Sequence, residues 1–294
     1  MKEVDPGIFK AYDVRGVYPE EIDEEVAHRI GRAFVTFLGE RKVVTGRDMR
    51  LSSPALSRAF IAGAAEQGAD VTDIGLCSTD MLYYASGVLD MPGAMFTASH
   101  NPKEYNGLKL CRRRAAPISM DTGIAEIKDL VLKGAFPENS SRGKVTEADM
   151  LERYVEHVLG FISASSLRPL KVVADAGNGM AGMILPAIFE RLPCELVPHC
   201  FELDGSFPHH QPDPINPENI KLLSAWVLEA GGDLGMAFDG DADRVFLVDD
   251  RGDPVSGSLT TAMVAKRILE TNPGERIIYN CINSWVVPET IRAY

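Results

Sequence analysis

Short apolar stretches typical of strands alternate with helix-like stretches along most of the chain, and this alternation is what most restricts its fold. Lys42–Thr45 has the pattern of a strand, and Gly93–Thr97 predicts a second, buried strand. Between them, Ser53 followed by Pro54 predicts the N-cap and first residue of a helix. That helix is expected to run to about Gln67. The order strand–helix–strand implies α/β domains in which helices sandwich mixed, largely parallel sheets.

Two changes in composition predict the domain boundaries. Residues 134–149 are rich in polar and turn residues, and a helix pattern from Leu151 and a strand pattern at Lys171–Asp175 then restart the alternation. A second boundary is expected at residues 253–254. We therefore expect a first domain over residues 1–148, a second over 149–253 and the start of a third over 254–294.

The third unit is expected to hold only a few elements. Leu259–Leu269 has a helix pattern, and Arg276–Tyr279 has a strand pattern. A stretch of about 40 residues is well below the size at which a domain usually folds alone. The chain is therefore expected to stop inside its third domain.

A weak internal repeat links the first two domains. Gly93–Ser99 and Gly235–Asp241 share glycine and phenylalanine at matching positions, which is two identities in seven. In each segment a strand pattern leads directly into a loop with reactive side chains. The repeat predicts two domains of similar topology whose loops face one cleft.

Charge and cysteine usage exclude several classes of function. The chain has 30 basic and 42 acidic residues, a net charge of −12, which argues against a nucleic-acid partner. Its five cysteines include no Cys-x-x-Cys pair, so we expect reduced thiols, no zinc site and a cytoplasmic location. The N-terminal residues lack the apolar core of a signal peptide, and no apolar run is long enough to cross a membrane.

An acidic protein that binds an anionic substrate must gather its cations locally. The candidate cations are Arg15, Arg47, Arg50, Lys103, Lys109 and the run Arg112–Arg114. For the run, a solvated surface face is the favoured interpretation.

A serine and a histidine follow the strand pattern at Gly93–Thr97. Ser99 is a candidate nucleophile or phosphate carrier, although a hydroxyl needs a base or electrostatic help to react. His100 is adjacent, but neighbours on an extended turn point apart, so His100 serves either Ser99 or the substrate. The alternative is an ordinary turn, since Ser, His, Asn and Pro all suit turns. No Gly-x-Ser-x-Gly elbow surrounds Ser99, which disfavours an α/β-hydrolase triad.

Three aspartates at alternate positions follow a second strand pattern. In an extended backbone this spacing places Asp239, Asp241 and Asp243 on one side, where their charges need a cation. All-oxygen ligation suits Mg²⁺ or Ca²⁺. An EF-hand is excluded because Arg244 and Asp250 stand where its glycine and glutamate are required. Mg²⁺ with a phosphate oxygen therefore fits better, and Arg244 either neutralises a carboxylate or holds a phosphate. A solvated acidic turn is the alternative, which the flanking apolar strands disfavour.

Several segments together indicate one family. They are Phe9–Gly16, Gly46–Ser53, Thr97–Pro102, Tyr105–Lys109, Leu203–Pro208 and Asp239–Arg244. Through these segments the chain resembles the α-D-phosphohexomutases, in the phosphomannomutase/phosphoglucomutase branch, along its whole length.

The resemblance implies a role for each matched residue. Ser99 is expected to carry the phosphoryl group as phosphoserine. Asp239, Asp241 and Asp243 are expected to bind Mg²⁺, with an oxygen of phosphorylated Ser99 as a further ligand. Residues expected to line the reaction centre, as acid/base or charge-stabilising groups, are Arg15, His100, Lys109 and Arg244, and those expected to bind substrate are Tyr12, Arg15 and Lys109.

The resemblance also implies a reaction. It interconverts hexose 6-phosphate and hexose 1-phosphate, of mannose, glucose or both, through a 1,6-bisphosphate. A glucose 1,6-bisphosphate-type activator is implied as well. The general base is either His100 or Lys109, and the intrinsic pKa of histidine near neutrality favours His100. Lys109 would need a depressed pKa.

Other interpretations remain open. The sugar-reading loop of the family's third domain and the phosphate-gripping loop of its fourth are not matched in this chain. The chain is therefore either the N-terminal portion of an enzyme or a non-catalytic phosphosugar-binding fragment. Phosphoglucosamine is an alternative substrate, and the Asp-x-Asp pattern also suits a phosphatase with Asp239 as nucleophile. The sequence does not choose between a monomer and a dimer.

Overall fold

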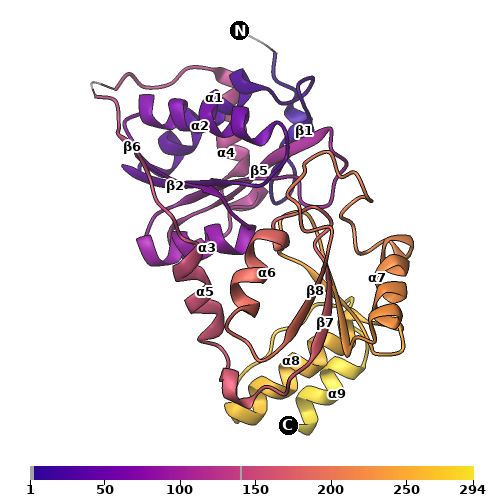
Figure 1. Cartoon of the computed structure of the whole chain (residues 1–294). Coiled ribbons are helices and arrows are strands. Elements are labelled where there is room, and N and C mark those ends of the chain that lie inside the picture. The colour runs from indigo at the N-terminus through magenta and orange to yellow at the C-terminus, as the bar shows by residue number, and fades with distance from the viewer. Residues whose placement is uncertain (1–2, 140) are drawn as a thin grey trace.

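The computed structural model describes residues 3–139 and 141–294. It has two α/β lobes, each built on one sheet, joined through helix α5 (Leu151–Leu159) (Figure 1). Helices lie on both faces of each sheet, which confirms the fold class predicted from the alternation of strands and helices. Within the described ranges, no helix combines the length and apolar character needed to span a bilayer.

The N-terminal lobe holds a six-stranded mixed sheet. Its strands are β1 (Val14–Val17), β2 (Lys42–Arg47), β3 (Asp70–Leu76), β4 (Gly93–Phe96), β5 (Tyr105–Cys111) and β6 (Val145–Glu147). Their order across the sheet is β1-β5-β4-β2-β3-β6. The pairs β4–β2, β2–β3 and β3–β6 are parallel, whereas β5 pairs antiparallel with both β1 and β4.

Four helices cover this sheet. They are α1 (Glu24–Leu38), α2 (Ser53–Glu66), α3 (Thr79–Leu89) and α4 (Ile124–Lys133), and only α3 lies on the lower face in Figure 1. Strand β4 is therefore buried on both sides. Phe96 packs against Phe60 on one face, and Met95 packs with Met81 on the other. Burial on both faces explains why this strand is a continuous apolar run.

Helices α1 and α2 approach each other closely because each has a glycine at the contact. A Cβ atom on Gly31 would lie 2.2 Å from the carbonyl oxygen of Phe60, and one on Gly63 would lie 2.1 Å from that of His28. Helix α1 begins after Asp23, whose carboxylate accepts a hydrogen bond from the Val26 amide. This pair of helices forms one wall of the larger hydrophobic core.

The C-terminal lobe holds a five-stranded mixed sheet. Its strands are β7 (Lys171–Asp175), β8 (Glu195–His199), β9 (Leu234–Phe238), β10 (Val245–Val248) and β11 (Pro254–Val255). Their order is β11-β10-β9-β7-β8, with β7 parallel to β8 and β9 and the other pairs antiparallel. In both lobes, the strand that leads into a reactive loop has one parallel neighbour and one antiparallel neighbour. The loop then connects it to the antiparallel one. The internal repeat therefore corresponds to a shared local topology.

The remaining helices complete the second lobe and the connections. They are α6 (Ala181–Phe189), α7 (Pro217–Ala230), α8 (Gly257–Thr271) and α9 (Val286–Ala293), with 3-10 helices at Pro6–Ile8, Arg113–Ala115, Met120–Thr122 and Ala164–Ser166. α6 and α7 lie on opposite faces of the second sheet (Figure 1). Val173 packs in the cluster formed with α7, and its neighbour Ala174 packs in the cluster formed with α6.

Some local predictions are wrong. Arg276–Tyr279 forms no strand: Ile278 is 97% exposed and no described strand lies beside it to pair with. Helix α2 has Ser52 rather than Ser53 in the N-cap position, and the Ser53 hydroxyl donates to the Asp48 carboxylate. The turn-rich stretch 134–149 contains β6, which is paired with β3.

The structure also bears on where the second lobe ends. β11 pairs with β10, so the second sheet extends just beyond residue 253. The boundaries of the three domains stay predictions. Helices α8 and α9, in yellow in Figure 1, pack against each other at the far end of the second lobe.

Candidate active site

Ser99 lies in the loop that follows β4, at the junction of the two lobes. Its backbone is in the left-handed region (φ 52°), and its side chain is fully buried. The Ser99 amide donates to the hydroxyl of Thr97 at 2.8 Å, which fixes the turn. The Ser99 hydroxyl donates to Oδ2 of Asp239, in the other lobe, at 2.6 Å. The serine loop and the acidic loop are therefore in direct contact.

A buried arginine holds the serine loop from behind. Arg50 is fully buried and forms an ion pair with Asp48, 3.3 Å from Nε to Oδ2. Its guanidinium donates to four backbone carbonyls of the serine loop and the segment after it. The acceptors are the carbonyl oxygens of Ser99, Asn101, Pro102 and Tyr105. The sequence makes Arg50 a candidate cation for an anionic substrate. In the structure, however, its donors are directed at carbonyl oxygens of the protein backbone.

The acidic loop joins β9 to β10 and presents three carboxylates to one point. One oxygen from each of Asp239, Asp241 and Asp243 lies within 4.8 Å of the others. Asp239 and Asp241 are fully buried. Close packing against the serine loop requires a glycine between them, because a Cβ atom on Gly240 would lie 2.6 Å from the Ser99 carbonyl oxygen.

The electrostatics of this triad fit a bound cation. Oδ1 of Asp241 and Oδ1 of Asp243 are buried without a hydrogen-bond partner among the described residues. Burial, followed by the charges of these two neighbours, raises the pKa of Asp239 to about 8. Unsatisfied buried oxygens and mutual repulsion are both relieved by a divalent cation. An all-oxygen set of this kind is the ligand chemistry of Mg²⁺.

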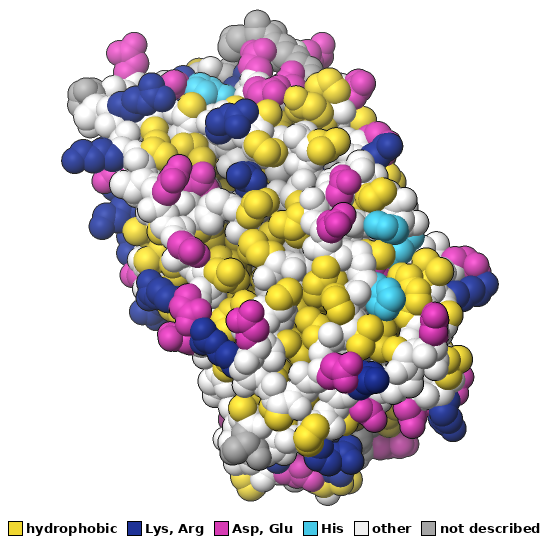
Figure 2. Space-filling model, viewed as in Figure 1, with side chains coloured by type: hydrophobic (Ala, Val, Ile, Leu, Met, Phe, Trp, Pro, Cys, Tyr) yellow, Lys and Arg dark blue, Asp and Glu magenta, His cyan; other side chains and the backbone are white. Residues whose placement is uncertain are grey.

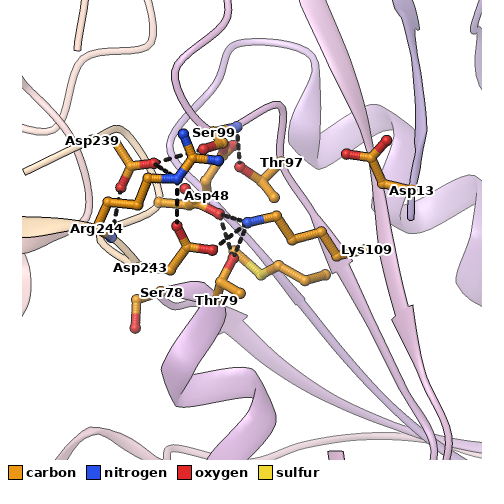
Figure 3. Close-up of polar contacts among 12 residues, drawn as sticks. Asp13, Asp48, Ser78, Thr79, Thr97, Ser99, Lys109, Asp239, Asp243 and Arg244 are labelled. Carbon is orange, nitrogen blue, oxygen red and sulfur yellow. Dashed lines mark hydrogen bonds and ion pairs between the residues drawn. The ribbon is translucent and has the colours of Figure 1, made fainter. Parts of the chain in front are cut away.

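Lys109, on β5, reaches the triad from the first lobe. Its Nζ atom lies 2.6 Å from Oδ2 of Asp241 and 2.5 Å from Oδ2 of Asp243, as Figure 3 shows for the latter pair. Burial alone would lower the pKa of Lys109, but the two carboxylates outweigh it and raise the pKa above its usual range. The depressed pKa that a lysine base would need is therefore not found. Thr79, at the start of α3, also donates to Asp241.

His100 and Arg244 lie on the other side of Ser99. Nδ1 of His100 is 3.3 Å from the Ser99 hydroxyl and 3.1 Å from Nη1 of Arg244. Burial, then the charge of Arg244, lowers the pKa of His100. The two side chains of Ser99 and His100 therefore face each other, because the left-handed backbone at Ser99 replaces the extended turn that would separate them.

Arg15 and Tyr12, which were also predicted to belong to the site, lie at different distances from the cluster around Ser99. Arg15, on β1, donates to Oδ1 of Asn101 and also pairs with Asp13, so it lies against the serine loop. Tyr12 is 79% exposed, and in the described part of the chain no hydrogen bond or ion pair joins it to the cluster. The structure brings together Ser99, His100, Lys109, Asp239, Asp241, Asp243 and Arg244, with Arg15 alongside, and leaves Tyr12 at the surface.

The basic run lies away from this cluster. Arg113 pairs with Glu40 and Asp90, and Arg114 is 86% exposed, as expected for a solvated face. On the face shown in Figure 2, basic and acidic side chains are interspersed, without a large field of one sign.

Sequence reasoning missed three supporting residues. Thr97 orders the serine turn, Thr79 donates to the triad, and Gln211 donates to the His100 carbonyl at 2.8 Å. Thr97 precedes Ser99 by two residues, a spacing at which a hydroxyl accepts from the backbone. For Thr79 and Gln211 the local sequence gives no signal, because both contacts join segments more than 100 residues apart.

Comparisons with known proteins agree with this architecture. Residues 6–138 match phosphoglucomutase/phosphomannomutase alpha/beta/alpha domain I, and residues 152–252 match domain II. A phosphomannomutase of Salmonella typhimurium is 41% identical over 293 residues, which are 97% of this chain and 64% of that protein. The phosphohexose mutases of Xanthomonas campestris are 41% identical over 288 residues, 96% of this chain and 63% of that protein.

A solved structure gives the same result. The crystal structure of a phosphoglucomutase/phosphomannomutase family protein from Burkholderia thailandensis matches with a TM-score of 0.93 at 36% identity, covering 99% of this chain and 65% of that one. Two successive α/β domains, each a sheet between helices, match the alpha/beta/alpha domains of the phosphoglucomutase/phosphomannomutase class. The chain belongs to the phosphoglucomutase/phosphomannomutase family and carries its domains I and II. It spans about 64% of the length of the curated relatives that it matches.

Proposed function

We propose that the protein of which this chain is part is a phosphohexomutase that interconverts hexose 6-phosphate and hexose 1-phosphate. One observation carries the proposal: the Ser99 hydroxyl lies 2.6 Å from Asp239, in a triad of two buried and one partly buried carboxylate, two of whose oxygens have no hydrogen-bond partner among the described residues. This is an arrangement for moving a phosphoryl group to and from a serine, since such transfer depends on positioning and on charge stabilisation. The names of the relatives support mannose or glucose as the sugar.

Asp239, Asp241 and Asp243 would hold Mg²⁺, together with an oxygen of phosphorylated Ser99. When bound, Mg²⁺ supplies positive charge to the phosphoryl oxygens as they gain negative charge. The Oδ1 atoms of Asp241 and Asp243, which are buried and have no hydrogen-bond partner among the described residues, support this assignment. The described residues also provide Lys109, which neutralises part of the triad's charge and stays protonated there.

His100 is the proposed proton acceptor for the sugar hydroxyl. A histidine whose pKa is lowered is neutral at physiological pH, and its Nδ1 lone pair, which accepts from Arg244 in this structure, is the one that would take the proton. Arg244, at 3.1 Å from His100, and Arg15, against Asn101, would bind phosphoryl oxygens rather than accept protons. Lys109 is assigned a charge-stabilising role, because its raised pKa makes it a poor base.

The transfer proceeds in two steps in this proposal. Phosphorylated Ser99 gives its phosphoryl group to the free sugar hydroxyl, and a hexose 1,6-bisphosphate forms. The hydroxyl proton passes to His100, which returns it to the released Ser99 oxygen, 3.3 Å away. The bisphosphate then reorients in the site and returns its other phosphoryl group to the Ser99 oxygen. A bisphosphate of this type also serves as activator, because it phosphorylates Ser99 in the resting enzyme. A cytoplasmic location suits these substrates.

Replacement of the serine tests the proposal. In the full protein that contains this chain, Ser99→Ala should abolish conversion of mannose 1-phosphate and glucose 1-phosphate to the 6-phosphates. Ser57→Ala is the matched control, because Ser57 is equally buried and its hydroxyl has no described hydrogen-bond partner. Intact-mass measurement should show one phosphate on the wild-type chain and none on the alanine variant. Full isomerisation by Ser99→Ala overturns the proposal.

The products distinguish this reaction from simple hydrolysis. A phosphatase with Asp239 as nucleophile would release free hexose and would keep that activity in Ser99→Ala. A chain that only binds phosphosugar would carry no phosphate on Ser99 and would show no turnover. Either result contradicts the proposed mutase.

A further inference from the structure

A second group of metal-ligating side chains lies outside the proposed active site. Asp175 is the last residue of β7, Cys200 directly follows β8, and His210 lies in the segment that leads from β8 to α7. One ligand atom from each residue lies within 4.8 Å of the others. The carboxyl ends of two adjacent parallel strands therefore bring an oxygen and a sulfur ligand together, and the segment after β8 adds a nitrogen ligand.

The three side chains are already oriented toward a common centre. Nδ1 of His210 lies 2.9 Å from the carbonyl oxygen of Gln211, which sets the ring so that Nε2 points inward. Oδ1 of Asp175 accepts from the Gly177 amide at 2.9 Å, which leaves Oδ2 on the inner side. In known metal sites, a ligating histidine typically has its second nitrogen held by a backbone carbonyl in this way.

The contact between the histidine and the aspartate is incomplete as a hydrogen bond. Nε2 of His210 is 2.9 Å from Oδ2 of Asp175, yet Nε2 is buried and makes no aligned hydrogen bond to any described residue. Nε2 therefore faces the Asp175 carboxylate and lies in one cluster with the Cys200 sulfur.

The ligand set selects the type of metal. A thiolate, an imidazole and a carboxylate suit a borderline ion such as Zn²⁺, with bonds of about 2.0–2.3 Å, and do not suit Mg²⁺. We propose that Asp175, Cys200 and His210 form a Zn²⁺ site, distinct from the Asp239–Asp243 triad, with a fourth position open to water. The free cysteine needed for it is available, since Cys200 is unpaired and partly exposed. This proposal does not depend on the proposed mutase activity.

The site lies next to the serine loop. Gln211 follows His210, and its side-chain amide donates to the carbonyl of His100 at 2.8 Å. A metal held by His210 would therefore also fix the residue that supports His100. The absence of a Cys-x-x-Cys pair predicted no zinc site, but these three ligands come from separate parts of the chain that only the folded sheet brings together.

A direct titration tests the site. The protein is first stripped of bound metal, and millimolar Mg²⁺ is then added to occupy the oxygen sites. It is titrated with Zn²⁺ in competition with a chromophoric chelator. We expect one equivalent to bind to the wild type and at least a tenfold weaker affinity in Cys200→Ser and His210→Gln. Cys194→Ser is the matched control, because Cys194 is a partly exposed cysteine whose sulfur contacts only the Arg168 carbonyl among the described residues. Equal affinity in all four proteins overturns the proposal.

Thiol protection locates the ion independently of the variants. Zn²⁺ should slow alkylation of Cys200 at least tenfold, as read by peptide mass spectrometry, and should leave Cys194 and the exposed Cys281 unchanged. This readout remains valid if His210→Gln fails to fold, since it uses the wild-type protein. Alkylation of Cys200 at the same rate with and without Zn²⁺ contradicts the site.

Discussion

The Arg50 guanidinium donates to the carbonyl oxygen of Ser99 at 2.9 Å, so a buried cation of the first lobe holds the backbone of the proposed phosphate carrier. Three more carbonyls, from residues 101, 102 and 105, share the same guanidinium. A planar group with five donors can satisfy this set at once, whereas a point charge cannot. The guanidinium thus contacts the backbone of a residue in the left-handed conformation.

We expect Arg50→Lys to disorder the serine loop although it keeps the charge. A lysine ammonium cannot reach four carbonyls, and each lost charge-assisted hydrogen bond in a buried site is worth about 1.5–3 kcal/mol. Urea unfolding should show a loss of at least about 3 kcal/mol, and intact mass should show less phosphate on Ser99. Arg114→Lys is the control, because Arg114 is 86% exposed. Equal stability of the two variants would argue against this role.

Two helical glycines should have opposite effects on stability when replaced by alanine, because one lies at the close contact of α1 and α2 and the other faces open space. Gly63→Ala would place its Cβ atom 2.1 Å from the His28 carbonyl, so the helices must separate, at a cost of about 1–3 kcal/mol. Gly87 lies inside α3 with no atom within 4 Å of an added Cβ, so Gly87→Ala should stabilise the protein by roughly 0.5–1 kcal/mol. Thermal unfolding of both variants gives the signs. A loss of stability in both would contradict the packing argument.

Much of the fold could be predicted from the sequence, and the errors have a common cause. Gly93–Thr97 and Leu234–Phe238 are short apolar runs, and both are strands because helices cover both sides of their sheets. Arg276–Tyr279 has a similar pattern but no strand beside it among the described residues, and it stays unpaired. A strand depends on its neighbours, which a local pattern does not contain.

In the candidate site, too, the features set by a local sequence pattern could be predicted, whereas those set by distant segments could not. The alternate spacing of Asp239, Asp241 and Asp243 is a local pattern, and the structure does place their oxygens together. The left-handed conformation of Ser99 is not visible in the sequence, and its contact with Arg50 joins residues 49 positions apart. The position of Lys109 between two carboxylates, and hence its raised pKa, likewise requires the contact between lobes.

The pair of His210 and Asp175 predicts a pH dependence of stability. The Asp175 carboxylate, and then Cys200, raises the pKa of His210 from 6.5 to about 10. A group whose folded pKa is raised stabilises the fold fully below its unfolded pKa and loses that contribution as pH rises through its folded pKa. In metal-free protein, the free energy of unfolding should therefore fall between pH 6.5 and about 10.

Variants at adjacent positions test this pH dependence. His210→Gln and Asp175→Asn should each flatten the fall, as measured by urea unfolding at several pH values. His209→Gln should keep it, because His209 contacts the amide of Asn178 rather than a carboxylate. A wild-type profile that is flat over this range would contradict the assignment.

The triad predicts a conflict between stability and metal binding at Asp239. Its pKa is raised to about 8 by burial and by the neighbouring carboxylates, so its ionisation destabilises the metal-free fold as pH rises toward 8. In chelator at pH 8, Asp239→Asn should raise the free energy of unfolding by about 0.5–2 kcal/mol. In Mg²⁺ at 100 times its dissociation constant, the wild type should gain about 2.7 kcal/mol and the variant much less. Asp121→Asn, at an exposed position, should behave as the wild type in both conditions. A variant that is less stable in chelator yet still gains the full Mg²⁺ increment would show that the three carboxylates neither repel one another nor share a cation.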